Sequence, residues 1–213
     1  MKNIAIFDMD GTLIDSGLDI TLSINYVRFE CYALEPLSVQ SVIDAINAPV
    51  RNLAEIFYGQ PLYEDRARDL FEHHYFDQCI QNVKPYEGIP TVLETLHENG
   101  YAMGVATNAP TLFAKRMLEH LKLDSYFGLI IGADEVESPK PHPQMINRHL
   151  EHYAFRSGTD NAWMIGDNSK DMEAASRAGI LSVFAGWGFS SHGEGDYFAH
   201  SPETLVDIIC TKG

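Results

Sequence analysis

Short apolar runs recur along most of the chain, and segments with helical spacing lie between them. The runs are unbroken and bounded by polar residues, which is typical of strands buried on both faces of a parallel sheet. The predicted strands are residues 4–7, 101–106, 129–132, 162–165 and 181–185. Three of the predicted helices between and after these strands span residues 111–121, 169–178 and 202–210. Two more are predicted by where they end, one at residues 99–100 and one near residue 153. Repeated strand–helix units predict an α/β fold, a three-layer doubly wound parallel sheet with helices on both faces.

Residues 16–82 interrupt this alternation. Over about 65 residues the apolar positions keep helical spacing and no strand pattern is found. The predicted helices are residues 19–32, 38–46, 52–58 and 64–81. A helical block between the first and second strands of a parallel sheet is an insertion. The sequence therefore predicts a core domain of residues 1–15 and 83–213 and an inserted, all-helical domain of residues 16–82.

Composition and charge exclude several classes of partner. The chain has 213 residues and a formal net charge of −15, which argues against nucleic acid or an anionic membrane as a partner. No apolar run approaches the ~20 residues of a membrane span. The chain starts almost directly with a predicted core strand, so we expect no signal peptide. Three cysteines far apart, without zinc spacing, predict a reduced, cytoplasmic protein.

Candidate chemistry begins where the first strand ends. Asp8 and Asp10 follow it directly, and the ligand crevice of an open α/β sheet lies beyond the carboxyl ends of its strands. Two acids this close repel unless a cation or a shared proton relieves them, so the stretch predicts a metal site. An EF-hand is excluded because Thr12 and Leu13 stand where its fifth and sixth positions need Asp or Asn and then Gly. An acidic turn that caps the next helix remains an alternative.

Three further strand ends carry polar side chains. Thr107 and Asn108 follow the second core strand, and Lys140 lies in a proline-rich loop after the third. Asp167 ends the fourth strand, with Asp171 four residues later. Each feature alone is common in turns and caps, but all of them at one edge of one sheet predict a catalytic site.

These motifs resemble those of the haloacid dehalogenase superfamily. The segment Phe7-Asp-Met-Asp-Gly-Thr-Leu13 is similar to its first motif, and the other three follow in the superfamily's order. The inserted helices resemble the helical cap of one large branch. Segments 84–88, 186–189 and 196–202 resemble the phosphoglycolate-phosphatase-like branch. The resemblance implies a Rossmann-like core that hydrolyses a small phosphorylated metabolite.

The resemblance also implies a role for each acid of the first motif. Asp8 would be the nucleophile that forms an aspartyl-phosphate, and Asp10 the general acid and base. Mg²⁺ would be held by the side chains of Asp8 and Asp167 and by the backbone carbonyl of Asp10. No organic cofactor is expected.

The remaining motif residues would bind the phosphoryl group. Thr107 and Asn108 would donate hydrogen bonds to it, and Lys140 would neutralise charge on nucleophile and phosphate. Asp171 would support the site by orienting Lys140 or a metal-bound water, not by ligating the metal directly.

The substrate is left open at this stage. Five basic residues are candidates for binding a second anionic group of the substrate: Arg28, Arg51, Arg66, Arg68 and Lys84. Arg51 is the choice among them. A phosphosugar mutase of the β-phosphoglucomutase type is the nearer alternative, because the core motifs do not separate it from a phosphatase. A pyrophosphatase and a non-catalytic binding protein of the same fold are farther alternatives. The protein is expected to be a monomer or a homodimer.

Overall fold

The chain divides into two units in the computed structural model, which describes residues 1–48, 52–190 and 192–212. One unit comprises Met1–Ile14 and Pro85–Gly213, and the other comprises Asp15–Lys84. The chain passes between the units at β2 (Ile14–Asp15) and β3 (Lys84–Pro85), which pair as a two-stranded sheet. The two units are described separately below.

The larger unit is built on a six-stranded sheet with the order β5-β4-β1-β6-β7-β8. All neighbouring strands pair in parallel. The strands are β1 (Asn3–Phe7), β4 (Ala102–Ala106), β5 (Leu129–Ile131), β6 (Asn161–Gly166), β7 (Leu181–Ala185) and β8 (Tyr197–Ala199). This confirms the predicted α/β class with a doubly wound parallel sheet.

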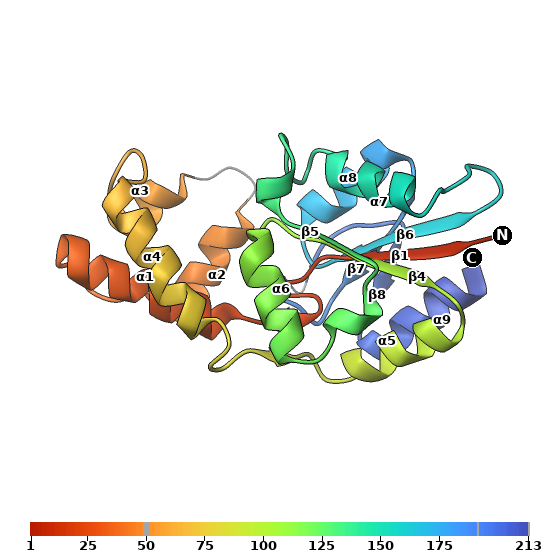
Figure 1. Cartoon of the computed structure of the whole chain (residues 1–213), viewed down its shortest axis with the longest axis horizontal. Helices are drawn as coiled ribbons and strands as arrows, with labels where there is room; N and C mark the ends of the chain where they lie inside the picture. Colours follow the sequence, from red (N-terminus) through yellow and green to blue (C-terminus); the bar gives the residue numbers. More distant parts are fainter. Residues whose placement is uncertain (49–51, 191, 213) are drawn as a thin grey trace. The chain divides into compact units, whose positions relative to one another are not determined.

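Helices cover both faces of this sheet. In Figure 1, α7 and α8 lie over one face, and α5 and α9 lie over the other. The helices of this unit are α5 (Ile89–Glu98), α6 (Thr111–His120), α7 (Gln144–His152), α8 (Ser169–Ala178) and α9 (Pro202–Lys212), with 3-10 turns η1 (Asp124–Tyr126) and η2 (Ala133–Glu135). The arrangement is the predicted three-layer one.

The side-chain alternation of β1 explains why its sequence is apolar throughout. Successive side chains of a strand point to opposite faces, so a strand covered by helices on both sides has no polar face. Ile4 and Ile6 are fully buried in one core cluster, which also includes Met145 of α7 and Ala174 of α8. Phe7 is also fully buried, and its ring contacts the ring of Phe127 edge to face.

The position of β1 in the sheet determines where the site forms. From β1 the chain builds outward through β4 and β5 on one side, and through β6, β7 and β8 on the other. The strand order therefore reverses between β1 and β6, and ligands of open α/β sheets bind beyond the carboxyl ends of the strands at this point. Asp8 continues the pairing there, since its backbone N–H donates to the Ile165 carbonyl at 2.8 Å.

The smaller unit is helical, with helices α1 (Gly17–Tyr32), α2 (Val39–Asn47), α3 (Leu53–Tyr58) and α4 (Asp65–Gln78). Ser38 and Asn52 begin α2 and α3, and their side chains accept backbone N–H groups of the first turn. Apolar faces of these helices form a core of their own, which comprises Ile24, Val27, Val42, Ala45, Phe57, Tyr58 and Ala67.

Several details differ from the predicted elements, among them the short pair β2 and β3, which was not predicted. The last helix of the smaller unit ends at Gln78, not at residue 81, because the chain then turns so that the Asn82 N–H donates to the buried Asp19 carboxylate. Strand β8 was not predicted, since it has only three residues and lies at the edge of the sheet. Within the described residues, no helix combines the length and the apolar character needed to cross a membrane.

Candidate active site

Lys140 lies between two carboxylates in the interior of the larger unit. Its Nζ is 2.7 Å from Oδ1 of Asp8 and 2.6 Å from Oδ1 of Asp171. Side-chain exposure is 2% for Lys140 and Asp171 and 12% for Asp8. Ion pairs shielded from water in this way interact far more strongly than surface pairs. The predicted proximity of Lys140 and Asp171 is therefore present in the structure.

Three carboxylates meet at the carboxyl ends of β1 and β6. One oxygen from each of Asp8, Asp167 and Asp171 lies within 4.8 Å of the other two, and all three residues are buried. Asp8 follows β1, Asp167 follows β6, and Asp171 lies in the first turn of α8. Asp171 also accepts the Asn168 N–H as part of a capping box, which fixes the start of α8.

A loop after β7 holds Asp167 in place. The carboxylate oxygen Oδ2 of Asp167 accepts the backbone N–H groups of Phe189 at 2.8 Å and Ser190 at 3.2 Å. Gly11 lies against the same carboxylate with a φ of +83°, so a side chain there would meet Asp167 in a backbone conformation that favours glycine. Sequence reasoning missed these two amides, because a backbone donor in a loop has no residue-type signature.

The electrostatics of the cluster favour an added cation. Burial raises the pKa of Asp167 to about 8, and the negative charges of Asp8 and Asp171 act in the same direction. Burial also raises the pKa of Asp171 to about 7, although Lys140 opposes the shift. Burial alone would lower the pKa of Lys140, but Asp171 and Asp8 together raise it above its usual value. The cluster thus holds three buried carboxylates, and Lys140 contacts two of them, Asp8 and Asp171.

This donor set fits a hard divalent cation. Mg²⁺ prefers carboxylate, carbonyl and water oxygens, and it is held by few side chains together with a substrate phosphate. The cluster offers only oxygen ligands from its three acids. A cation would also offset the repulsion that raises the pKa of Asp167. The acidic cluster therefore fits a divalent metal site.

Thr107 and Asn108 follow β4, as predicted, and the structure shows what their side chains contact. Asn108 Nδ2 donates to the Lys140 carbonyl at 2.9 Å, and Asn108 Oδ1 accepts the Lys140 N–H at 3.1 Å. The buried Thr107 hydroxyl oxygen accepts the Ala109 N–H at 3.1 Å. The second motif is thus tied to the loop that carries Lys140.

The remaining predicted site residues are Asp10 and the basic candidates for substrate binding. Asp10 is half-buried, and its backbone forms an isolated bridge with Ile14. Arg51, the predicted substrate ligand, lies outside the described residues. Arg28 is buried within the smaller unit, where its guanidinium donates to the carbonyls of Glu35 and Phe57. Of the remaining basic candidates, Arg66, Arg68 and Lys84 are exposed.

Comparison with known proteins agrees with this geometry. The family model described as "Haloacid dehalogenase-like hydrolase" matches residues 5–185. A phosphoglycolate phosphatase of Aquifex aeolicus is 34% identical over 208 residues, which cover 97% of this chain and 96% of the relative. The pyrophosphatase PpaX of Halalkalibacterium halodurans is 28% identical, with 99% of this chain and 98% of the relative covered.

Solved structures show the same likeness. A crystal structure of a predicted phosphatase from Clostridium acetobutylicum superimposes with a TM-score of 0.80 at 27% identity. The match covers 99% of this chain and 99% of that one. The likeness therefore extends over both units, not over the sheet alone.

Proposed function

The chain belongs to the family of haloacid dehalogenase-like hydrolases, and from that premise we propose that it is a Mg²⁺-dependent phosphatase of small phosphomonoesters. The observation that carries the proposal is the buried contact of Lys140 with both Asp8 and Asp171, beside Asp167. A nucleophilic carboxylate, a fixed ammonium group and a cation site at one edge of the sheet are the parts that phosphoryl transfer needs.

In the first half-reaction, Asp8 acts as nucleophile. One of its carboxylate oxygens attacks phosphorus, the bond from phosphorus to the ester oxygen breaks, and an aspartyl-phosphate forms. Asp10 donates a proton to the departing oxygen, so that an alcohol and not an alkoxide leaves. Lys140 stabilises the negative charge on the phosphoryl oxygens, because its ammonium group already touches Asp8.

In the second half-reaction, water replaces the alcohol. The water oxygen attacks phosphorus while Asp10 accepts a proton from that water, and the bond from Asp8 to phosphorus breaks. The products are inorganic phosphate and the regenerated Asp8 carboxylate. Thr107 and Asn108 would donate hydrogen bonds to the phosphoryl oxygens in both steps.

The metal would be held by the side chains of Asp8 and Asp167 and by the backbone carbonyl of Asp10. When bound, Mg²⁺ supplies positive charge that offsets the negative charge of the phosphoryl oxygens. Asp167 is prepared for this role by the two amides that fix one of its oxygens. Asp171 acts differently, because its Oδ1 contacts Lys140 and its Oδ2 accepts the N–H of Asn168.

We propose a small phosphorylated acid of the phosphoglycolate type as the substrate. The relative named phosphoglycolate phosphatase is the more similar of the two reported, at 34% against 28% identity. Pyrophosphate is the second candidate, since the relative named as a pyrophosphatase is covered over 98% of its length. A cytoplasmic location and a monomeric or homodimeric state stay predictions.

Phosphate release from a panel of substrates tests the proposal. The panel holds phosphoglycolate, sugar phosphates, nucleotides and pyrophosphate, each assayed with Mg²⁺ and with a chelator. We expect Mg²⁺-dependent release, highest for phosphoglycolate, and none from the Asp8→Asn variant. Release highest from pyrophosphate would select the second candidate. Release from none of them by folded, Mg²⁺-bound protein would contradict the phosphatase, and activity only with a sugar bisphosphate activator would indicate a mutase.

A further inference from the structure

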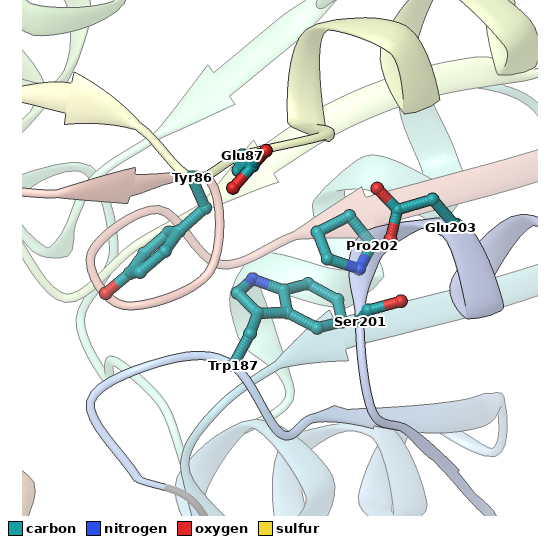
Figure 2. A pocket seen from close by; sticks show the side chains of 6 residues that line it. All are labelled: Tyr86, Glu87, Trp187, Ser201, Pro202 and Glu203. Atoms are coloured by element: carbon teal, nitrogen blue, oxygen red, sulfur yellow. The ribbon is translucent and has the colours of Figure 1, made fainter.

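A pocket that none of the proposed catalytic residues lines opens on the larger unit. Its volume is about 250 Å³, and it is lined by Tyr86, Glu87, Trp187, Ser201, Pro202 and Glu203. Figure 2 shows these side chains around a common space, with contributions from three separate segments. Tyr86 and Glu87 precede α5, Trp187 follows β7, and the other three lie at the start of α9.

Two of the six residues that line the pocket, Tyr86 and Trp187, are aromatic. The indole Nε1–H of Trp187 donates to the Thr12 carbonyl at 3.0 Å, which anchors one edge of the ring that lines the pocket. Pro202 is buried and forms another wall of the pocket. The face of an indole or phenol ring carries negative charge density that attracts cations.

The charge of the pocket has one sign. Glu87 and Glu203 are both exposed carboxylates, and no basic side chain is among the described residues that line the pocket. A hydrogen bond from the Ser201 side chain lowers the pKa of Glu203, so this carboxylate is ionised at neutral pH. An anionic ligand is therefore disfavoured here.

A bare metal ion is disfavoured as well. Metal ions need several oxygen ligands that converge on one point. Within the described part of the chain, the only cluster of three or more metal-ligating side chains is the one formed by Asp8, Asp167 and Asp171. Two carboxylates beside aromatic rings instead suit a cation with apolar surface.

We propose that this pocket binds a small organic ammonium ion, and the proposal goes beyond the phosphatase function. The cationic head would lie against the rings of Trp187 and Tyr86, with the carboxylates of Glu87 and Glu203 as counter-charges. A volume of about 250 Å³ leaves room for an alkylated ammonium group and a short chain.

Two-dimensional NMR of the indole N–H groups tests the proposal without an activity assay. The chain has two tryptophans, and Trp163 is fully buried in the sheet. The Trp187→Phe variant assigns the two signals. Choline is the probe, its neutral isostere 3,3-dimethylbutanol is the ligand control, and sodium chloride at equal concentration controls for ionic strength. We expect a saturable shift of the Trp187 signal with choline, and none of the Trp163 signal.

Carboxylate variants then decide between charge and shape. Glu203→Gln and Glu87→Gln should each weaken choline binding about threefold, the usual size of the contribution of one exposed ion pair. The exposed Glu119→Gln on α6 is the matched control and should leave the affinity unchanged. Equal shifts with the neutral isostere, no shift with choline, or unchanged affinity in both pocket variants with unaltered thermal unfolding would each overturn the proposal.

Discussion

The side chain of Asn108 forms hydrogen bonds with both the backbone N–H and the backbone carbonyl of Lys140. The amide nitrogen donates to the Lys140 carbonyl at 2.9 Å, and the amide oxygen accepts the Lys140 N–H at 3.1 Å. The two residues are 32 positions apart and come from the loops after β4 and β5. An amide nitrogen carries two hydrogens, so this contact is compatible with a second bond to a phosphoryl oxygen. Asn108 thereby positions the backbone from which the ammonium group of Lys140 reaches Asp8.

Replacing Asn108 tests this positioning role. Asn108→Ala removes both hydrogen bonds to the Lys140 backbone, and we expect kcat to fall about 10²-fold, because a misplacement of about 1 Å in a phosphoryl-transfer site costs this much. The control is Asn99→Ala, which removes a side-chain bond to the Thr95 carbonyl away from the site. Steady-state kinetics with the best substrate of the panel measures both variants. Turnover of Asn108→Ala within twofold of the parent would refute the role.

The general-acid role of Asp10 predicts a dependence on the leaving group. Asp10→Asn cannot donate the proton, so turnover of an alkyl phosphate should fall by about 10²–10⁴-fold. An ester with an acidic leaving group, such as p-nitrophenyl phosphate, needs little protonation of that group. The rate of its first half-reaction should therefore fall much less. Comparison of kcat/KM for the two esters measures the difference. The exposed Asp124→Asn serves as control, and equal losses for both esters would rule out proton donation by Asp10.

The Asp167 carboxylate predicts a stability effect of metal removal. In the metal-free protein the pKa of Asp167 is raised to about 8 from 3.8, chiefly by burial, so the folded state binds a proton that the unfolded state releases. The free energy of unfolding therefore falls as pH rises from about 4 to about 8. Asp167→Asn removes this penalty and keeps an acceptor for the two loop amides.

Thermal unfolding at pH 8.5 measures this effect. In chelator we expect Asp167→Asn to unfold at least about 5 °C above the parent, a shift that corresponds to one to two kcal/mol in a chain of this size. Added Mg²⁺ should stabilise the parent by mass action and leave the variant almost unchanged. A variant that is less stable than the parent in chelator, or one equally stabilised by Mg²⁺, would contradict the role of Asp167.

Much of the fold could be predicted because its signals are local. The bounds of α8 and β7 agree with the predicted ranges 169–178 and 181–185, since each element carries its own periodicity and α8 also carries a capping pair. The positions of Asp8 and Asp167 follow from a general rule of α/β sheets, which places polar residues at strand ends.

The rest depends on contacts between distant segments, which leave no local pattern. The amides of Phe189 and Ser190 bind Asp167 through backbone atoms, so any residue types would allow these bonds. The contact of Asn108 with Lys140 joins two loops, and a loop has no period that predicts its partner. Strand β8 has three residues, too few to show a period of its own, and it pairs with β7 at the edge of the sheet.

His149 is a buried titratable residue of α7, and its ring packs against β4. It is fully buried on α7, and its Nε2 lies 3.0 Å from the Val105 carbonyl, which makes Nε2 the donor. Its Nδ1 is buried and has no hydrogen-bond partner within the part of the chain that the structure describes. The ring packs so closely on Gly104 that a Cβ at that position would overlap it. A second proton on Nδ1 would therefore be a buried donor with no acceptor among the described residues, which favours the neutral ring.

The pH dependence of stability should carry the signature of this ring. Burial lowers the pKa of His149 to about 4 from 6.5, so between these values the unfolded state binds a proton that the folded state does not. The contribution of the neutral His149 ring to the free energy of unfolding is complete above pH 6.5 and is lost as pH falls to about 4, a change of roughly 3 kcal/mol. Denaturant unfolding of the parent and of His149→Gln, whose amide can still donate to Val105, measures the difference. As pH falls, the free energy of unfolding should decrease less steeply in His149→Gln than in the parent. The exposed His120→Gln should show the same decrease as the parent. Identical pH slopes for the parent and His149→Gln would show that His149 is protonated in the folded state despite its burial.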